Sequence, residues 1–439
     1  GPFSSKPFRH MCVSPIGAVP KPGSSKVRVI HHLSHPHHGD SVNASVVEEH
    51  MSLPSFGTAA RAVQEMGRGC HLIKLDVEAA YKQVPVRRED WPLLGFKWQG
   101  QWYYERVLPF GLRSSCRLWE LYAAALHFFV QEILPTSGPR RIIHYVDDFL
   151  FVVQGEKAIA DRLLADALAL CSDLGLPMAA DKTVGPATQL TFLGLELDTQ
   201  RMEARLPSAR HESLQQLMVV WGRKKEEAAE RRRLRRRKGT PEPDKPDAAA
   251  ASVQELQSLT GLLNFACAVV RPGRFYLRRI INHTIRVAAI TRSRTARFPI
   301  SDSVWADVEW WRDFLSQWNG VSLLYEREWT DAPLIELFTD ACDSGYGARY
   351  GRQWFAGRWS MDELSAARRN TRISMPFLEL RALTCLAAAT WGSGWRGRKI
   401  TFRCDCMPVV QAISRCTSRS PSTHASLAPP VYSRVSLRL

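Results

Sequence analysis

The segment Arg141–Val153, with the sequence R-I-I-H-Y-V-D-D-F-L-F-V-V, places two adjacent carboxylates between two apolar runs. The branched and aromatic residues of both runs favour β-strands, and Asp147 and Asp148 fall where a hairpin would turn. A buried pair of ionised neighbours is costly unless a cation compensates it, and carboxylate oxygens suit Mg²⁺. The segment therefore predicts two strands joined by a turn that holds a divalent metal. An ordinary hairpin with aspartates in its turn is the alternative.

A further acidic position lies upstream, in His71–Val86 (H-L-I-K-L-D-V-E-A-A-Y-K-Q-V-P-V). A short apolar strand ends at Asp76, and Tyr81 follows five positions later. A lone aspartate after a strand more often forms a cap or a turn. Here the two segments, in this order, resemble the first catalytic motif and the catalytic hairpin of reverse transcriptases. The resemblance implies that Asp76 shares two metal ions with Asp147 and Asp148. It also implies that Tyr81 lies under the sugar of the incoming nucleotide and selects deoxyribose by its bulk.

Composition agrees with a large enzyme that handles a polyanion. The chain has 439 residues, enough for two or three domains, and 45% of them are hydrophobic. Its formal net charge of +16 suits nucleic acid, although a basic protein without such a partner is the alternative. No stretch approaches the ~20 apolar residues of a membrane span, and no secretory signal is visible. Ten scattered cysteines indicate reduced thiols in an intracellular protein, in cytoplasm or nucleus. The first residue, Gly1, suggests a piece of a longer polyprotein.

An N-terminal hairpin is expected around a Pro-Gly-Ser-Ser turn, because residues 14–20 look extended and residues 26–33 alternate. It resembles the fingers hairpin of the polymerase, whose basic side chains neutralise triphosphate charge. By position Lys26 and Arg28 match best, with solvated charges on a hairpin as the alternative. The histidines that follow lie in a polar loop without cysteine, so a zinc site is disfavoured. They are His31, His32, His35, His37 and His38.

Three later segments extend the resemblance. Leu108–Trp119 (L-P-F-G-L-R-S-S-C-R-L-W) is similar to the motif that contacts the incoming nucleotide, with Phe110 and Gly111 closest to it. Cys116 stands where the family usually has proline, Trp119 where it has phenylalanine, and Arg113 replaces a small residue, which puts efficient nucleotide binding in doubt. A segment around Lys182 resembles the motif that supplies a lysine near the pyrophosphate. The primer-gripping hairpin is expected at Phe192, Leu193 and Gly194.

The middle of the chain suits a helical thumb at residues 205–280, with a charged, flexible insertion at 223–251 that is too polar to bury. This insertion could grip phosphates, with a solvated helical insertion as the alternative. A connection over 281–333 places tryptophans at helical spacing, which indicates core. The arginines expected to contact the template-primer backbone are Arg271, Arg274, Arg278 and Arg279.

A second set of acids occupies residues 334–439. Asp340 follows a strand, Glu379 lies in an amphipathic helix, and Asp405 ends another strand. This order resembles ribonuclease H, and it implies that the three acids bind two Mg²⁺ ions and cut the RNA strand of a hybrid. The tail after Asp405 contains no further acid, and Cys406 stands where asparagine commonly follows. A truncated or decayed ribonuclease H domain is therefore expected.

The combined prediction is an α+β protein. Fingers and palm occupy residues 1–204 of a right-hand polymerase, followed by thumb, connection and an incomplete α/β ribonuclease H-like domain. The expected function is RNA-directed DNA polymerisation with two Mg²⁺ (or Mn²⁺) ions per active site. The expected partners are an RNA template, a DNA primer, an RNA–DNA hybrid, deoxynucleoside triphosphates and other domains of the polyprotein. Retrotransposons of the DIRS type are most similar, with long-terminal-repeat elements next. The alternatives are a decayed remnant that only binds nucleic acid, and a nuclease with an inactive polymerase platform.

Overall fold

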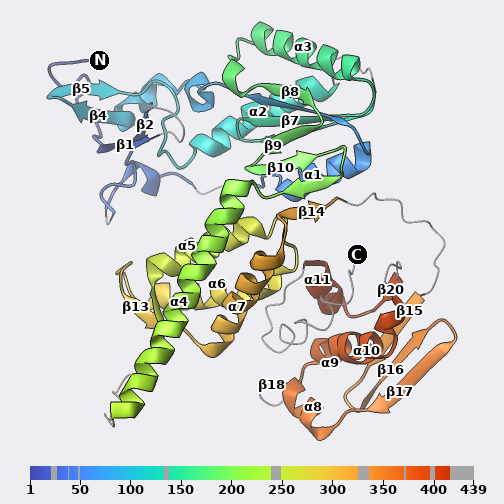
Figure 1. The fold of residues 1–439 in the computed structure, drawn as a ribbon. Coiled ribbons are helices and arrows are strands. Elements are labelled where there is room, and N and C mark those ends of the chain that lie inside the picture. The colour runs from blue at the N-terminus through green and yellow to red at the C-terminus, as the bar shows by residue number, and fades with distance from the viewer. Residues whose placement is uncertain are drawn as a thin grey trace. The chain divides into compact units, whose positions relative to one another are not determined.

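A computed structural model describes the chain except for residues 21–26, 38, 48–49, 133–137, 239–248, 325–335, 370–371, 396–400 and 416–439. The chain separates into two compact units (Figure 1), and the first comprises Gly1–Ala204 together with Leu323 and Leu324. No helix in the described part of the chain is long and apolar enough to cross a membrane.

The first unit is built around a four-stranded sheet with the order β6-β7-β3-β8. The central strands are β3 (His71–Asp76) and β7 (Asp148–Val153), flanked by β6 (Arg140–Tyr145) and β8 (Val184–Ala187). Strand β7 is buried along almost its whole length, as its continuous apolar run predicts. Helices α2 (Ser115–Glu132) and α3 (Lys157–Asp173) cover one face, while α1 (Phe56–Met66) packs against β6 and β7.

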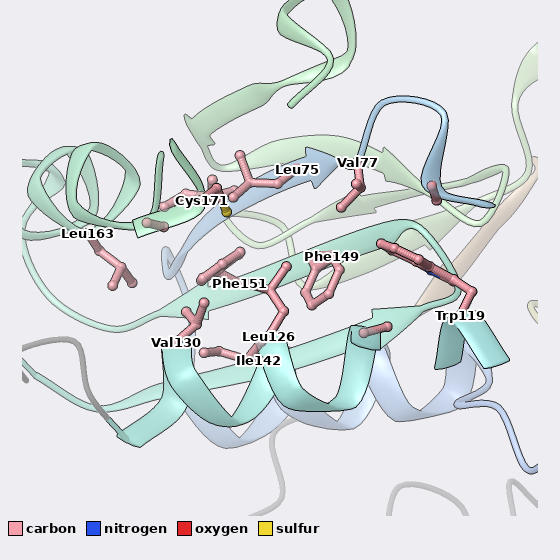
Figure 2. Close-up of a cluster of buried hydrophobic side chains, with 14 of the residues drawn as sticks. Leu75, Val77, Trp119, Leu126, Val130, Ile142, Phe149, Phe151, Leu163 and Cys171 are labelled. Atoms are coloured by element: carbon pink, nitrogen blue, oxygen red, sulfur yellow. The ribbon is translucent and has the colours of Figure 1, made fainter. Parts of the chain in front are cut away.

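The core between the sheet and helices α2 and α3 is a continuous apolar cluster (Figure 2). Leu75 and Phe149 reach it from the strands, and Trp119 and Leu126 reach it from α2. Because side chains alternate along a strand, Asp76 and Asp148 face the opposite side of the sheet. The alternation thus places both acids on the face opposite this cluster.

Smaller elements complete this unit. They are the hairpin β1 (Ile16–Pro20) and β2 (Val27–His31), the hairpin β4 (Gly95–Trp98) and β5 (Gln101–Tyr104), and the strands β9 (Gln189–Phe192), β10 (Leu195–Asp198) and β11 (Glu203–Arg205). Short 3₁₀ helices include Ala80–Gln83, Arg88–Leu94 and Ala180–Lys182. The hairpin expected between residues 87 and 107 is β4–β5.

The second unit begins with four helices. They are α4 (Ser208–Lys238), α5 (Val253–Ala266), α6 (Gly273–Ile290) and α7 (Asp302–Gln317), with a small ladder of β12 (Ala250–Ser252) and β13 (Arg297–Pro299), and β14 (Val321–Leu323) at the end. Helix α6 packs on both α5 and α7, and α4 packs on α7. Trp305 and Trp311 are buried, as expected of core.

Helices cross two of the boundaries that the sequence analysis placed in this region. Helix α4 continues through the charged block to Lys238, so residues 223–238 of the expected flexible insertion are helical. Ion pairs explain this: Lys224 contacts Glu255 at 2.7 Å, and Glu227 lies one turn from Arg231. The boundary expected at residue 280 falls inside α6, and α7 packs on α4 and α6. Residues 239–248 lie outside the described part.

The rest of the unit is a four-stranded sheet with the order β17-β16-β15-β20. Strand β15 (Glu336–Ala341) pairs antiparallel with β16 (Gly345–Tyr350), which pairs with β17 (Gln353–Arg358), while β20 (Thr401–Arg403) runs parallel to β15. The accompanying elements are α8 (Met361–Ala367), β18 (Arg368–Arg369), β19 (Arg372–Ile373), α9 (Met375–Arg381), α10 (Ala388–Trp391) and α11 (Met407–Arg415). The tail at 416–439 lies outside the described residues.

Candidate active site

Three carboxylates meet at one end of the first sheet. Asp76, the last residue of β3, lies directly opposite Asp148, the first residue of β7. Strand β6 ends at Tyr145, which also lies opposite Asp148, so Val146 and Asp147 form the turn. The amide of Val77 donates a hydrogen bond to the carbonyl oxygen of Asp147 at 3.1 Å. Strand register and this bond therefore bring together acids that lie 71 positions apart in the sequence.

The backbone of the turn is strained, and a core residue supports it. Val146 has a φ of +58°, which is unusual for a β-branched residue. Such backbone persists when the surroundings fix it, and it clusters at functional sites. The indole nitrogen of Trp119, a fully buried residue of α2, donates a hydrogen bond to the carbonyl oxygen of Val146 at 2.9 Å. The core in Figure 2 therefore supports the acidic turn directly.

Two lysines partly neutralise the acids. Lys182 Nζ lies 2.7 Å from Asp76 Oδ1, and Lys74 Nζ lies 2.9 Å from Asp148 Oδ1. Burial raises the pKa of Asp147, and the nearby charges of Asp76 and Asp148 raise it further. Burial opposes protonation of Lys182, but its hydrogen bond to Asp76 and the acidic charges outweigh this and raise its pKa. The site holds three carboxylates and two lysine ammonium groups, so its negative charge is not fully compensated and a cation can bind.

The three carboxylates do not converge on one point. Among the described residues, three or more histidine, cysteine or acidic side chains have ligand atoms all within 4.8 Å of one another at one place, which is not this site. That group consists of Glu379, Cys404 and Asp405. The ion pairs to Lys74 and Lys182 account for the spread at the first site, because each draws one carboxylate to a lysine. Their all-oxygen donor set still fits a hard divalent cation.

An aromatic and cationic stack borders the acids. The rings of Tyr81 and Phe110 lie 4.9 Å apart, and the Arg28 guanidinium lies 4.6 Å from the centre of the Phe110 ring. Burial raises the pKa of Tyr81, and a hydrogen bond with Cys116 adds to the effect. Cys116, which departs from the family pattern, is thus a partner of this tyrosine. Lys26 lies outside the described residues.

A buried asparagine fixes the loop that carries Phe110. Asn43 donates to the Gly111 carbonyl at 2.8 Å and accepts from the Arg113 amide at 2.8 Å. Gly111 has a φ of +107°, and a Cβ there would lie 1.9 Å from the His31 carbonyl oxygen. Only glycine tolerates both constraints. The backbone of Arg113, rather than its charge, therefore anchors this part of the loop.

One histidine of the cluster has a structural role. His31 is buried, and its Nε2 lies 3.2 Å from Glu105 Oε1. The ring of His32 lies near the rings of His35 and His37. No group of metal-ligating atoms that includes them occurs among the described residues, and His38 is outside that part. 

The hairpin expected to grip the primer is a tight β-turn. Phe192 of β9 pairs with Leu195 of β10, and the two turn residues have positive φ values, +49° at Leu193 and +75° at Gly194. This is the turn type that matches the twist of a two-residue hairpin. Phe192 is fully buried, so it anchors the hairpin, while Leu193 and Gly194 form its tip.

The predicted arginines of the thumb differ from one another. Arg271 and Arg274 are exposed at the start of α6, and Arg278 is half-buried. Arg279 instead forms a bidentate ion pair with Asp307, a fully buried residue of α7. Burial raises the pKa of Asp307 to about 6 even though Arg279 opposes the shift. The guanidinium of Arg279 is therefore engaged between two helices.

A second acidic site lies in the second unit. Asp340 is on β15, Glu379 is on α9 and Asp405 follows β20, so parallel strands and one helix bring the three together. Glu379 is buried, and the Ala341 amide donates to its Oε1 at 3.2 Å. Burial raises the pKa of Glu379 to about 7, and the charges of Asp340 and Asp405 contribute to the rise. A depression of about 910 Å³ opens beside Asp340 and Asp405.

Several contributors escaped the sequence analysis. Lys74 looks like an ordinary polar residue of an alternating strand, and Asn43 like a loop residue. Trp119 was expected only as a departure from the family pattern. Their roles depend on contacts with residues 27 to 74 positions away, which local patterns do not contain.

Comparison with known proteins finds a family match within the first unit. Residues 19–197 match the family model described as reverse transcriptase (RNA-dependent DNA polymerase). No match was found among curated proteins. The fold is similar to a foamy viral protease-reverse transcriptase dRH in complex with double-stranded DNA, with 17% identity, a TM-score of 0.51, and coverage of 94% of this chain and 62% of that chain.

Two more solved structures are similar at 16% identity. One is the foamy viral protease-reverse transcriptase with double-stranded DNA, with a TM-score of 0.48 and coverage of 94% of this chain and 74% of that one. The other is that protein with an RNA/DNA hybrid, with a TM-score of 0.47 and coverage of 95% and 48%. The chain thus spans about three fifths of the first of these structures.

Proposed function

We propose that this chain, whose residues 19–197 form a reverse transcriptase domain, is an RNA-directed DNA polymerase that extends a DNA primer on an RNA template. The observation that carries the proposal is the register of Asp76 against Asp148 with Asp147 in the turn between β6 and β7. Three carboxylates on a rigid sheet, next to an aromatic and cationic stack, are what nucleotidyl transfer requires.

Asp76, Asp147 and Asp148 would hold two Mg²⁺ ions. When bound, these would lower the pKa of the primer 3′-hydroxyl and neutralise the triphosphate. The protein's own cations act on the same charge: Arg28 beside Phe110, and Lys182 beside Asp76. Lys26 belongs to the same proposal by its position in the sequence.

The aromatic and cationic stack indicates where the nucleotide would bind. A deoxynucleoside triphosphate would lie against Tyr81 and Phe110, with the tight backbone at Gly111 leaving room for sugar and base. The β9–β10 hairpin at Leu193 and Gly194 would hold the primer end. A net charge of +16 favours an RNA template and an RNA–DNA hybrid, with an affinity that falls as salt rises.

The thumb would contact the backbone of the duplex through α6. Exposed Arg271 and Arg274, with half-buried Arg278, are the proposed contacts. We leave Arg279 out of this set because Asp307 engages it.

The second acidic site supports a second activity, cleavage of RNA in an RNA–DNA hybrid. Asp340, Glu379 and Asp405 lie together on the strand, helix and strand that ribonuclease H would use. The sequence motifs favour a retrotransposon of the DIRS type as the source. Other domains of a parent polyprotein would then be partners.

Primer extension on an RNA template, with Mg²⁺ and the four deoxynucleotides, tests the first proposal. The wild-type chain should extend the primer, and the double variant Asp147→Asn/Asp148→Asn should not. Hybrid cleavage is tested separately with Asp340→Asn, which should abolish it and leave extension intact. If the wild type binds a hybrid at moderate salt but never extends a primer, the chain is a binding remnant and the proposed polymerase activity is wrong.

A further inference from the structure

A cysteine stands among the acids of the second site. Ligand atoms of Glu379, Cys404 and Asp405 all lie within 4.8 Å of one another. Cys404 is half-buried, directly follows β20 and is the neighbour of Asp405 in the sequence. Three side chains of ligating types from one helix and one strand end are therefore close enough to share one ion.

An independent feature also points to a ligand at this position. The Glu379 side chain is 5% exposed, and its Oε1 accepts the Ala341 amide. Its other oxygen, Oε2, is buried without a hydrogen-bond partner. Leaving a buried carboxylate oxygen unpaired is costly, and it is the oxygen that remains free to bind an ion. The adjoining depression, which Asp340, Cys404 and Asp405 all line, gives an ion access from solvent.

The thiol changes which ion such a site prefers. Mg²⁺ takes oxygen ligands in near-octahedral geometry and gives up its water reluctantly. Zn²⁺ accepts thiolate sulfur together with carboxylate oxygen in four-coordinate sites, and soft thiolate ligands select Zn²⁺ over Mg²⁺. Glu379, Asp405 and Cys404 form a mixed set of this kind, and Asp340 lines the same depression as Cys404 and Asp405.

We propose that Cys404, Glu379 and Asp405 form a binding site for Zn²⁺, in which the Cys404 sulfur is a ligand. The inference rests on the second acidic site of the proposed function but does not require that site to cut RNA. A Zn²⁺ ion held there excludes Mg²⁺ from the same carboxylates. Zinc therefore inhibits hybrid cleavage and leaves primer extension at the first site unaffected at the same concentration.

Binding is measured on the full chain by calorimetric titration with Zn²⁺, and by the near-ultraviolet absorption that thiolate gains when it binds Cd²⁺. The test variant is Cys404→Ser, and the matched control is Cys406→Ser, two positions away and outside the cluster. Comparison of Zn²⁺ binding by the two variants separates binding at this site from binding by the other cysteines and by the histidines. We expect Cys404→Ser to weaken the tightest Zn²⁺ binding by about tenfold or more and to remove one thiolate–Cd²⁺ band. Cys406→Ser should match the wild type.

A second measurement uses the unmodified chain and needs no variant to fold. Iodoacetamide labels accessible thiols, and fragment ions of the peptide Cys404–Arg415 separate Cys404 from Cys406. Zn²⁺ should protect Cys404 and leave labelling of Cys406 unchanged. Equal labelling of Cys404 with and without Zn²⁺, or equal loss of binding in both serine variants, overturns the proposal. Failure of primer extension or of hybrid cleavage affects only the proposed function, because neither assay enters the binding result.

Discussion

The indole nitrogen of Trp119 lies 2.9 Å from the carbonyl oxygen of Val146 and donates a hydrogen bond to it. Val146 has a positive φ and directly precedes Asp147. A residue in the apolar core thus holds the strained residue that positions Asp147. The helix that carries Trp119 starts just after the loop of Phe110 and Gly111, so one helix links that loop to the acidic turn.

Trp119→Phe tests this support. The substitution keeps an aromatic ring in the core but leaves the Val146 carbonyl without its donor, so we expect a loss of stability of about 1–3 kcal/mol. Primer extension should fall as well, by less than in Asp147→Asn, because the acid remains but its turn is looser. Urea unfolding and extension rates give the two results. Trp98→Phe, at an exposed position of β4, is the control and should change neither.

Strand and turn patterns were sufficient to predict the two strands and the acids at their ends, and the resemblance to reverse transcriptases supplied the expectation that Asp76 joins Asp147 and Asp148. The short apolar run before Asp76 and the continuous run after Asp148 are local features of the sequence. The charged block was expected as a flexible insertion, with a solvated helical insertion as the alternative, and it is helical through Lys238 because its polarity argues against burial but not against helix. Pairs such as Lys224 with Glu255 and Lys225 with Glu309, which stabilise it, join segments far apart in sequence.

The parts of the site that local patterns missed also depend on contacts between residues far apart in the sequence. Lys74 contacts Asp148 only because β3 and β7 are neighbours, and Asn43 binds Gly111 across 68 positions. Cys116 and Trp119 were expected to weaken nucleotide binding as departures from a family pattern. In the fold they contact Tyr81 and Val146, so each has a partner in the site.

Lys74→Gln tests whether the lysine ammonium groups compensate the carboxylate charge that a metal ion would otherwise compensate. Removal of the Lys74 ammonium leaves Asp148 without its ion pair, so the metal-free chain should lose about 1–3 kcal/mol of stability. Mg²⁺ should then stabilise the variant more than it stabilises the wild type, because less cationic charge competes for the carboxylates. Melting curves with EDTA and with Mg²⁺ give both quantities. Lys157→Gln, which breaks an exposed pair with Asp161, should leave the Mg²⁺ effect unchanged; equal Mg²⁺ effects in wild type and Lys74→Gln would refute the idea.

Tyr81→Ala tests sugar selection at the stack. Loss of the ring opens the space under the nucleotide sugar, so the preference for deoxyribonucleotides over ribonucleotides, as a ratio of kcat/KM, should fall by about tenfold or more. Tyr81→Phe keeps the bulk and removes only the hydroxyl that contacts Cys116. It should retain the preference. If the phenylalanine variant loses discrimination as fully as the alanine variant, the hydroxyl rather than the bulk is responsible.

Glu379 makes the stability of the second acidic site depend on pH. Its pKa in the fold is about 7 against an ordinary 4.5, because burial and then the charges of Asp340 and Asp405 raise it. Between these values the folded state binds more protons than the unfolded state, so stability is full below about pH 4.5 and falls as pH rises through about 7. Hydrogen exchange of the Ala341 amide, which donates to Glu379, reports this locally once rates are corrected for intrinsic pH dependence. In EDTA, protection of that amide should decrease from pH 5 to pH 8 in the wild type.

Glu379→Gln is the matched variant, because it keeps the size and an acceptor for Ala341 but does not ionise. Protection of the Ala341 amide in this variant should vary little over the same pH range. A divalent ion should oppose the wild-type loss at high pH, since it binds the ionised carboxylate, and it should have little effect on the variant. A wild-type profile as flat as that of the variant, or one that rises with pH, would show that the Glu379 carboxyl is already ionised in the fold.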